Sequence, residues 1–281
     1  MQITETIHAL TIPFTVPTPA GPIPRSVTVY LICGQQVTLI DSGVAGCEVP
    51  ILAYLEEIGR GGEITRLILT HSHPDHIGAA RALRAATGCA VLAPATERAW
   101  IEDTERQARE RPVPGFATLV GGPVAVDHLV HSGDVIDLGG GLQLEAVAAP
   151  GHSAGSTAYF LRREGALFCG DAVPLPHDLP IYDDYRTSLA TLERLAALTG
   201  VELLLEAWTA PTHQPPAARL AAGAAWLREI DAAVHRAASA GSPADPLALC
   251  RQVVEVLGLP APAANPLVAR SLASHGGALP G

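Results

Sequence analysis

The sequence has few charged residues and no excess of basic ones. Charged side chains make up 16% of the 281 residues, and Lys and Arg number 18 against 28 Asp and Glu, for a formal net charge of −10. With 48% hydrophobic residues and so few charges, the chain is not a disordered polyelectrolyte. Its negative charge would repel a phosphate backbone, so we expect no nucleic-acid partner.

Long apolar runs and a basic N-terminal start are also missing. Gly, Pro or charged residues break every apolar run well before the roughly 18 residues that a membrane span needs. The start of the chain, MQITETIHAL, has neither the basic start nor the continuous apolar segment of a signal peptide. We therefore expect a cytoplasmic protein with no membrane partner.

The cysteines are few and scattered. There are five, and no two form a Cys-x-x-Cys pair. A disulfide framework or a structural zinc knuckle therefore does not fit the pattern, and we expect small buried hydrophobic residues in a reducing compartment. These cysteines are Cys33, Cys47, Cys89, Cys169 and Cys250.

Most of the chain mixes strand and helix patterns. The β-branched runs 26–33 and 36–41 are split by Gly34 and predict a hairpin. The run 64–70 is apolar on both faces, which is typical of a central strand. Five prolines in residues 11–24 predict a loop with no regular ladder. The mixture of strands and helices predicts two packed sheets with helices outside.

The composition changes after Pro216, where the sequence becomes rich in alanine. Apolar residues then recur at helical spacing. We expect residues 1–216 to form the catalytic domain and residues 217–281 to form an α-helical appendage. The apolar stripe of its first helix consists of Leu220, Leu227, Ile230 and Val234.

The segment Thr70–His76, THSHPDH, crowds titratable side chains directly after an apolar strand. His71 and His73 are two residues apart in an extended segment, so they point the same way and can hold one ion. Asp75 and His76 follow the turn at Pro74 and can reach a second ion. Neutral imidazole suits zinc or iron, and a carboxylate adds negative charge to hold a dication.

Three further segments place a potential ligand beyond an apolar strand. His152 follows the strand predicted at 142–148, Asp171 follows the strand at 166–169, and His213 comes after the strand at 201–208. A side chain that can bind metal thus lies just beyond the end of an apolar strand in four segments of the chain. Together the four segments predict a metal centre.

These motifs resemble those of the metallo-β-lactamase superfamily. The resemblance rests on His-x-His-x-Asp-His at 71–76, Gly151-His152-Ser153, Gly170-Asp171 and LIDSG at 39–43, and it covers roughly residues 25–215. It implies an α+β fold, a four-layer αββα sandwich with the site at one sheet edge. The branch it is most similar to contains glyoxalase II and the lactonases.

The resemblance also implies which residues bind metal. Two divalent ions, zinc first and manganese or iron as alternatives, would share a bridging carboxylate, with the buried Asp41 orienting the metal loop. The ligands of the first ion would be His71, His73 and His152. The ligands of the second would be Asp75 and His76, with Asp171 as the bridge.

The last ligand departs from the family pattern. The family usually has a Gly-His pair directly after the final strand, where this sequence has Glu206-Ala207-Trp208. His213 comes several residues later. Either His213 completes the second site, or water or Glu206 does.

The chemistry expected of such a centre is hydrolysis of a small molecule. Metal coordination lowers the pKa of water to about 7, and the hydroxide could attack an ester, thioester, lactone or phosphoester. The Asp171 carboxylate would bind both ions, and Asp75 would bind metal or carry a proton to the leaving group. These two are the expected catalytic residues.

Residues that would contact the substrate are less well marked. His177, Tyr182 and Asp183 follow Asp171 in a Pro-rich segment, and each is either a substrate contact or loop surface. In some lactonases of the superfamily a tyrosine donates a hydrogen bond to a carbonyl oxygen, as Tyr182 could. The C-terminal helices resemble those of thioesterase members, but their arginines are dispersed, so the helices either cover the core or form a homodimer.

Two hypotheses from other classes stay open. A mononuclear iron dioxygenase of the same fold, similar to persulfide dioxygenases, would use a subset of these ligands. A non-catalytic sensor would have kept the fold without turnover. Metal content separates them, because hydrolysis predicts zinc or manganese near two per chain and oxidation predicts one iron. Nuclease activity conflicts with the negative charge. β-Lactam hydrolysis stays open but is not indicated, because no secretion signal would place the protein with the target of the drug.

Overall fold

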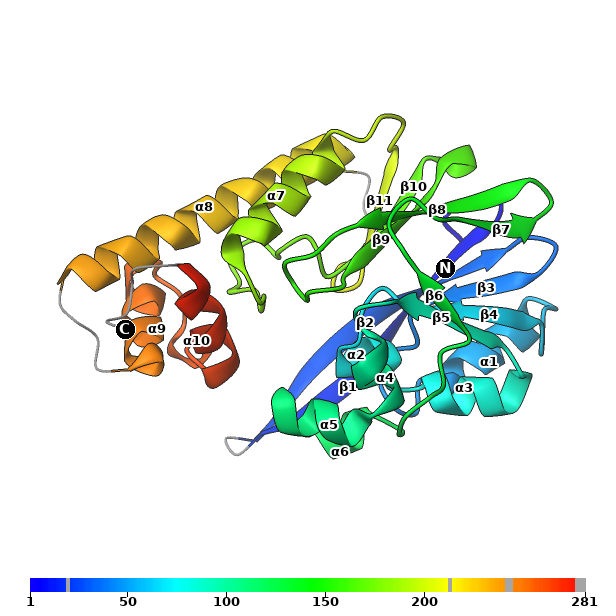
Figure 1. Ribbon diagram of the computed structural model, residues 1–281, viewed down its shortest axis with the longest axis horizontal. Coiled ribbons are helices and arrows are strands. Elements are labelled where there is room, and N and C mark those ends of the chain that lie inside the picture. Colours follow the sequence, from blue (N-terminus) through cyan, green and yellow to red (C-terminus); the bar gives the residue numbers. More distant parts are fainter. Residues whose placement is uncertain (19–20, 212–213, 241–244, 276–281) are drawn as a thin grey trace. The chain divides into compact units, whose positions relative to one another are not determined.

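The computed structural model describes residues 1–18, 21–211, 214–240 and 245–275. By its internal contacts the chain divides into two compact units (Figure 1). The first unit comprises Met1–Ala148, Gly155–Gly170 and Gly200–His213. The second unit comprises Ala149–Ala154, Asp171–Thr199 and Gln214–Gly281. The expected domain boundary after residue 216 stays a prediction.

The first sheet of the first unit has six strands in the order β1-β2-β3-β4-β5-β6. The β1–β2 and β2–β3 pairs are antiparallel and the remaining pairs are parallel, so the predicted hairpin at Gly34 is confirmed. The strands are β1 (Ile7–Thr18), β2 (Gly21–Cys33), β3 (Val37–Ile40), β4 (Ile64–Ile68), β5 (Ala90–Pro94) and β6 (His128–Val130).

The second sheet has five strands in the order β11-β10-β9-β8-β7. It is also mixed, because β10 pairs parallel with β11 and antiparallel with β9. The strands are β7 (Val135–Gly139), β8 (Leu142–Ala148), β9 (Thr157–Leu161), β10 (Ala166–Gly170) and β11 (Leu203–Glu206). A 3₁₀ turn, η1 (Arg162–Glu164), joins β9 to β10.

Two hydrophobic layers hold the first unit together. One lies between the sheets and joins side chains such as Tyr30 and Ile68 of the first sheet to Tyr159 and Phe168 of the second. The other packs the helices on the opposite face of the first sheet, where α1 and α3 are seen in Figure 1. The helices are α1 (Glu48–Glu57), α2 (Pro74–Ile77), α3 (Ala80–Thr87), α4 (Arg98–Glu102), α5 (Thr104–Glu110) and α6 (Phe116–Leu119). Two packed sheets with helices outside confirm the expected fold class.

The proline-rich segment 11–24 is a strand pair, so the prediction of a loop there was wrong. Pro13 pairs with Ser26, and Pro17 pairs with Pro22. Strand β1 is at the edge of its sheet, and β3 pairs only with residues 30–33 of β2. A proline has no N–H to donate to a neighbouring strand. At the edge of a sheet, or where the neighbouring strand has already ended, no acceptor is left unpaired by this absence. Residues 19 and 20 lie outside the described part of the chain.

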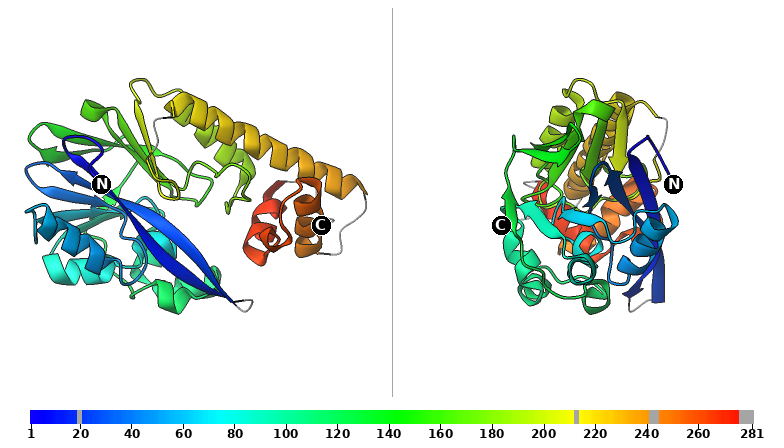
Figure 2. Two further views of the ribbon diagram at one scale, coloured as in Figure 1. Left: turned by 180° about the vertical axis from the view of Figure 1, so that it is seen from behind. Right: turned by 90° about the vertical axis from the view of Figure 1, so that its right-hand side faces the viewer.

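The second unit is helical. Figure 2 shows α7 alongside α8, with α9 and α10 packed together near the end of α8. The apolar stripe predicted for α8 is buried, from 0% exposure at Ile230 to 2% at Leu220. In the described residues, no helix combines the length and the apolar character needed to cross a membrane. The elements are α7 (Tyr185–Ala196), α8 (Pro216–Ala240), α9 (Pro246–Val256), η2 (Ala261–Ala263), α10 (Pro266–Leu272) and η3 (Ala273–His275).

Candidate metal centre

Strand ends of both sheets meet at Thr70, two residues beyond the end of β4. The Thr70 carbonyl accepts a hydrogen bond of 3.0 Å from the N–H of Thr157, where β9 begins. Gly170, the last residue of β10, lies so close that an added Cβ would be 2.8 Å from the Thr70 hydroxyl oxygen, and its φ is +51°. Only glycine fits this approach and this backbone conformation without strain. The next residues in the chain after Thr70 and Gly170 are the predicted ligands His71 and Asp171.

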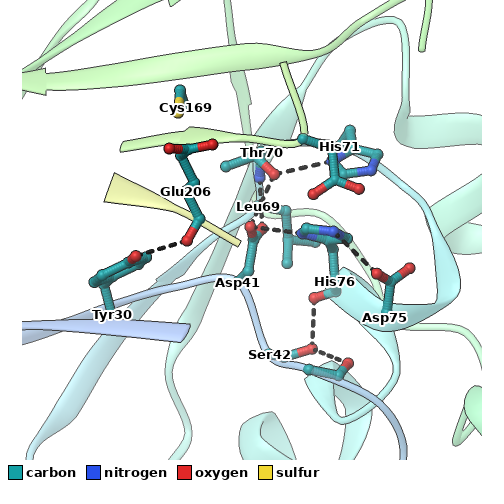
Figure 3. A network of polar contacts seen from close by, with 12 residues as sticks. Tyr30, Asp41, Ser42, Leu69, Thr70, His71, Asp75, His76, Cys169 and Glu206 are labelled. Atoms are coloured by element: carbon teal, nitrogen blue, oxygen red, sulfur yellow. Dashed lines mark hydrogen bonds and ion pairs between the residues drawn. The ribbon is translucent and has the colours of Figure 1, made fainter. Parts of the chain in front are cut away.

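Asp41 ties the motif segment to the first sheet (Figure 3). Its carboxylate is 3% exposed and accepts hydrogen bonds from the Thr70 N–H, the Thr70 hydroxyl and His76 Nδ1, each 2.8 Å long. Asp41 has a φ of +60°, a left-handed conformation that is uncommon for a residue with a side chain. The Ser42 N–H and hydroxyl both donate to the His76 carbonyl. These are the contacts expected of an acid that orients the metal loop.

The hydrogen bonds of the motif decide which imidazole nitrogen carries the lone pair. Because the single proton of the Thr70 hydroxyl goes to Asp41, its oxygen accepts from His71 Nδ1, at 3.0 Å. His76 Nδ1 likewise donates to the Asp41 carboxylate. In both rings Nε2 is therefore the nitrogen that can bind a metal ion, and the partner on Nδ1 fixes the ring's orientation.

The predicted ligands of the motif form two pairs. His71 and His73 present ligand atoms within 4.8 Å of each other, and their rings meet edge to face with centroids 4.4 Å apart. Asp75 Oδ2 lies 3.4 Å from His76 Nε2. Two atoms bonded to one tetrahedral ion with bonds of about 2.0–2.1 Å are separated by about 3.3–3.4 Å. The Asp75–His76 spacing therefore suits a shared ion.

Glu97 supports the motif through hydrogen bonds, and the sequence did not reveal this role. It is 3% exposed, and its carboxylate accepts from the Ser72 N–H and hydroxyl and, at 2.6 Å, from the Gly155 N–H. Gln107 donates to the Ser72 carbonyl from the other side. Glu97 thus links the motif to the segment after His152. In the sequence it is one of several acids in a stretch with helical, charged character, and nothing distinguishes it from its exposed neighbours.

His152 and Asp171 belong to the second unit and lie together there. His152 Nε2 is 3.3 Å from Asp171 Oδ2, which is again the spacing of two ligands on one tetrahedral ion. His152 Nδ1 is 2.6 Å from the carbonyl oxygen of Ile181. Since a carbonyl can only accept, Nδ1 carries the proton and Nε2 carries the lone pair. This is the same tautomer as in His71 and His76.

The remaining predicted residues have varied surroundings. Tyr182 is 3% exposed, and its hydroxyl is 2.6 Å from His275 Nε2. Asp183 is exposed and pairs with Arg270 at 3.0 Å. His177 is also exposed and lies against the Trp226 ring. Their roles in substrate binding stay predictions. His213 lies outside the described residues.

Glu206 ends β11, where its carbonyl accepts a 2.7 Å hydrogen bond from the Tyr30 hydroxyl. The residue is 7% exposed. Burial, with Cys169, Glu206 and Asp41 nearby, raises the pKa of Tyr30 well above its ordinary value, so this hydroxyl keeps its proton. A role for Glu206 in the second metal site stays a prediction.

Two mixed sheets, with histidines and aspartates just beyond their strand ends, define a class of α/β sandwich proteins that can hold metal. The family model of the metallo-beta-lactamase superfamily matches residues 22–208. The chain belongs to this superfamily, as its motifs predicted. The donor set of imidazole Nε2 atoms and carboxylates also fits a divalent metal ion.

Solved structures of the same fold cover nearly the whole chain. A metallo-beta-lactamase family protein from Thermus thermophilus is 20% identical, with a TM-score of 0.72 over 95% of this chain and 91% of the other. A beta-lactamase domain protein from Burkholderia ambifaria is 17% identical, with a TM-score of 0.74 over 98% of this chain and 86% of the other. At these identities the matches confirm the expected sandwich fold and nothing more specific.

Curated relatives resemble the chain over shorter stretches. A hydroxyacylglutathione hydrolase of Rhodospirillum rubrum is 32% identical over 126 residues, which is 44% of this chain and 39% of that protein. A probable metallo-hydrolase of Bacillus subtilis is 29% identical over 158 residues, 55% of this chain and 69% of that protein. The chain spans 39% to 54% of the length of the hydroxyacylglutathione hydrolases from Rhodospirillum rubrum, Ectopseudomonas mendocina and Methylococcus capsulatus.

Proposed function

We propose that the protein is a metal-dependent hydrolase that cleaves a thioester, or a related ester, of a small molecule. The observation that carries the proposal is the shared tautomer of His71, His76 and His152, each with Nδ1 bonded to a protein acceptor and Nε2 as the metal-binding nitrogen. Imidazoles are held this way in metal sites, where the second nitrogen is fixed by an outer partner. Relatives named hydroxyacylglutathione hydrolase favour a thioester among the possible bonds.

We assign the ligands to two ions. One ion would be held by His71, His73 and His152, and the other by Asp75 and His76, with Asp171 shared between them. Support comes from the Asp75–His76 and His152–Asp171 spacings of 3.4 and 3.3 Å. Zinc is the first choice of metal for this donor set, and manganese or iron is the alternative.

When bound, the divalent ions acidify a coordinated water to a pKa of about 7 and polarise the carbonyl oxygen of the substrate. The chain's own residues hold the metal-binding side chains in place. The Asp41 and Ile181 oxygens keep the rings of His76 and His152 in one tautomer. The Asp75 side chain is 16% exposed, so it can also pass a proton to a leaving thiolate or alkoxide from solvent.

The thiol part of the substrate is a separate question. The C-terminal arginines are dispersed in the sequence, and several already contact residues of the second unit. Arg228 pairs with Glu193, Arg270 pairs with Asp183, and Arg219 donates to the Pro174 carbonyl. They therefore do not form a cluster suited to several carboxylates. We propose a thioester whose thiol carrier needs no such clamp.

The test combines metal analysis with a substrate screen. Elemental analysis of the purified full chain should give about two zinc or manganese ions per chain, and metal removal should abolish turnover of thioesters, with lactones and phosphoesters as comparison substrates. His213→Ala tests the seventh ligand, because an unchanged metal content would exclude it. One iron per chain with thiol-dependent oxygen uptake would instead identify a dioxygenase and contradict the proposal.

A further inference from the structure

The segment between Asp171 and α7 is held by side chains of the C-terminal helices, all within the second unit. Arg219 Nη2 of α8 donates to the Pro174 carbonyl at 2.8 Å. About two turns further along α8, Trp226 Nε1 donates to the Asp178 carbonyl at 2.7 Å. Both side chains are nearly buried, at 5% and 7% exposure. These contacts are with the backbone of the segment, so they fix its path rather than its side chains.

The end of this segment is held by a line of three polar side chains, of which Tyr182 and His275 are buried and Asp231 is half-buried. The Tyr182 hydroxyl donates to His275 Nε2 at 2.6 Å, and His275 Nδ1 donates to Asp231 Oδ1 at 2.7 Å. The Tyr185 ring stacks on His275 with centroids 4.3 Å apart. We call Tyr182, His275 and Asp231 the tyrosine line. It joins the segment to α8 and to the 3₁₀ turn η3.

The tyrosine line is a poor candidate for a nucleophile and its base. Burial raises the pKa of Tyr182 well above its usual range, and burial also lowers the pKa of His275. Both groups are therefore neutral near pH 7, and both residues are buried. A largely buried line in which each donor has an acceptor allows one hydrogen-bonded arrangement, so it can hold a backbone in place.

The backbone beside Tyr182 is the part that contacts the predicted ligand His152. The Ile181 carbonyl accepts the 2.6 Å hydrogen bond from His152 Nδ1. The N–H groups of Asp183 and Asp184 donate to the Gly151 carbonyl at 2.7 and 3.2 Å. Residues 181–184 are thus hydrogen-bonded to both His152 and Gly151.

We propose that the tyrosine line is a positioning device that orients His152 for metal binding through the Ile181 carbonyl. The Tyr182 side chain and its backbone N–H, which donates to Ser271 Oγ at 2.9 Å, hold the residue from two sides. The direction of the preceding carbonyl is thereby set. The inference rests on the proposed function only in that His152 is taken as a ligand. It gives the C-terminal helices a role beyond covering the core or forming a dimer.

The test uses the full chain, stripped of metal and titrated with Co²⁺ alone. Tyr182→Phe removes one buried oxygen and keeps the ring, so the variant should fold. Outer partners of ligand histidines affect metal affinity by about 10–100-fold, and this more distant line should raise the Co²⁺ Kd by about 3–10-fold in Tyr182→Phe and more in His275→Ala. In the zinc-loaded protein, the ring N–H signal that His152→Ala removes should exchange with solvent about tenfold faster in Tyr182→Phe.

Val253→Ala is the matched control. This apolar side chain is fully buried in α9 of the same unit, so its truncation should lower the Tm without touching the tyrosine line. Its Co²⁺ Kd should equal that of the wild type. Equal weakening of Co²⁺ binding in Val253→Ala and Tyr182→Phe would overturn the inference, since general loosening would explain both.

The remaining outcomes separate the inference from the proposed function. Wild-type affinity and exchange in Tyr182→Phe, with His152→Ala losing Co²⁺, would overturn the positioning role alone. Wild-type Co²⁺ stoichiometry and affinity in His152→Ala would overturn the ligand assignment itself, and the positioning role with it.

Discussion

The predicted metal ligands fall into two halves, one in each unit, and the two halves are held in different ways. In the first unit, the motif 70–76 is fixed by buried carboxylates, because Asp41 binds Thr70 and His76 while Glu97 binds Ser72. In the second unit, His152 is fixed by a neutral backbone carbonyl, that of Ile181. The first half therefore depends on charge-assisted hydrogen bonds, and the second depends on where the backbone runs.

The difference also lies in how far along the chain the support comes from. Glu97 is 25 residues from Ser72. Tyr182, beside the carbonyl that holds His152, is supported by His275, which is 93 residues further on. A ligand held by side chains should respond to removal of a charge, whereas a ligand held by backbone should respond to changes in distant packing. The following substitutions are ways to test that contrast.

The largest effects should come from removing one ligand in each half. His73→Ala and Asp171→Asn should each lower kcat/KM by about a thousandfold or more and reduce bound metal, because the activated water depends on the ions. Circular dichroism should stay close to that of the wild type in both. Full activity in either variant would contradict the ligand assignment for that half.

The next effect should come from Glu97. Glu97→Ala leaves the buried Ser72 N–H and the half-buried Gly155 N–H without their acceptor, at about 1–3 kcal/mol for each, so the free energy of unfolding should fall by about 2–6 kcal/mol. Urea denaturation measures this, and elemental analysis follows the metal. Glu145→Ala removes a carboxylate that pairs with the exposed Arg162 and should change the free energy by less than about 1 kcal/mol. Equal losses in the two variants would show that Glu97 is not a special support.

A smaller loss of stability with a clear loss of metal should come from Asp41→Asn. Asparagine tolerates the φ of +60° at this position, so the variant changes the charge and one acceptor rather than the backbone. The hydrogen bond that orients His76 weakens, and metal affinity should fall by about 10–100-fold. Competition with a chelator measures the Kd. Wild-type affinity would show that charge does not hold this half of the site.

The location of the candidate site could be predicted from the sequence because its predicted ligands lie just beyond strand ends. The motif 70–76 follows β4, whose last residues, Leu67 and Ile68, are buried, so the polar residues that come next lie at the sheet edge. The same argument located His152 and Asp171 beyond β8 and β10. A short pattern of residue types with known spacing was sufficient, because each ligand is positioned by the strand that precedes it.

The supports of the site could not be predicted in the same way. A backbone carbonyl such as that of Ile181 has no signature in a sequence, and the acid Glu97 looks like any other charged residue of its stretch. Tyr182 was selected as a substrate contact because of its place in the chain, but its hydroxyl partner, His275, depends on tertiary packing. The prediction for the prolines of 11–24 failed for a related reason, since their tolerance depends on being at a sheet edge, which only the topology decides.

The smallest effect should come from Asp184, and it isolates helix stability from support of the ligand. The Asp184 side chain caps α7 by accepting from the Thr187 N–H, while its backbone N–H bonds separately to the Gly151 carbonyl. Asp184→Ala should therefore cost about 1 kcal/mol of unfolding free energy and leave the Co²⁺ Kd unchanged. A changed Kd would mean that α7 itself, rather than the backbone of 181–184, supports His152.

The pH dependence of that loss gives a second check on Asp184. Hydrogen bonds from the side chain and backbone N–H of Thr187 lower the pKa of Asp184 below the ordinary value of 3.8. A lowered carboxyl pKa contributes stability that is fully present above the unfolded-state pKa and is lost as the pH falls through the folded-state pKa. The difference between wild type and Asp184→Ala should therefore be constant near neutral pH and shrink on acidification below about pH 4. If the difference in unfolding free energy stays the same in acid, the ionised Asp184 cap is not its source. The difference would then come from packing around the start of α7.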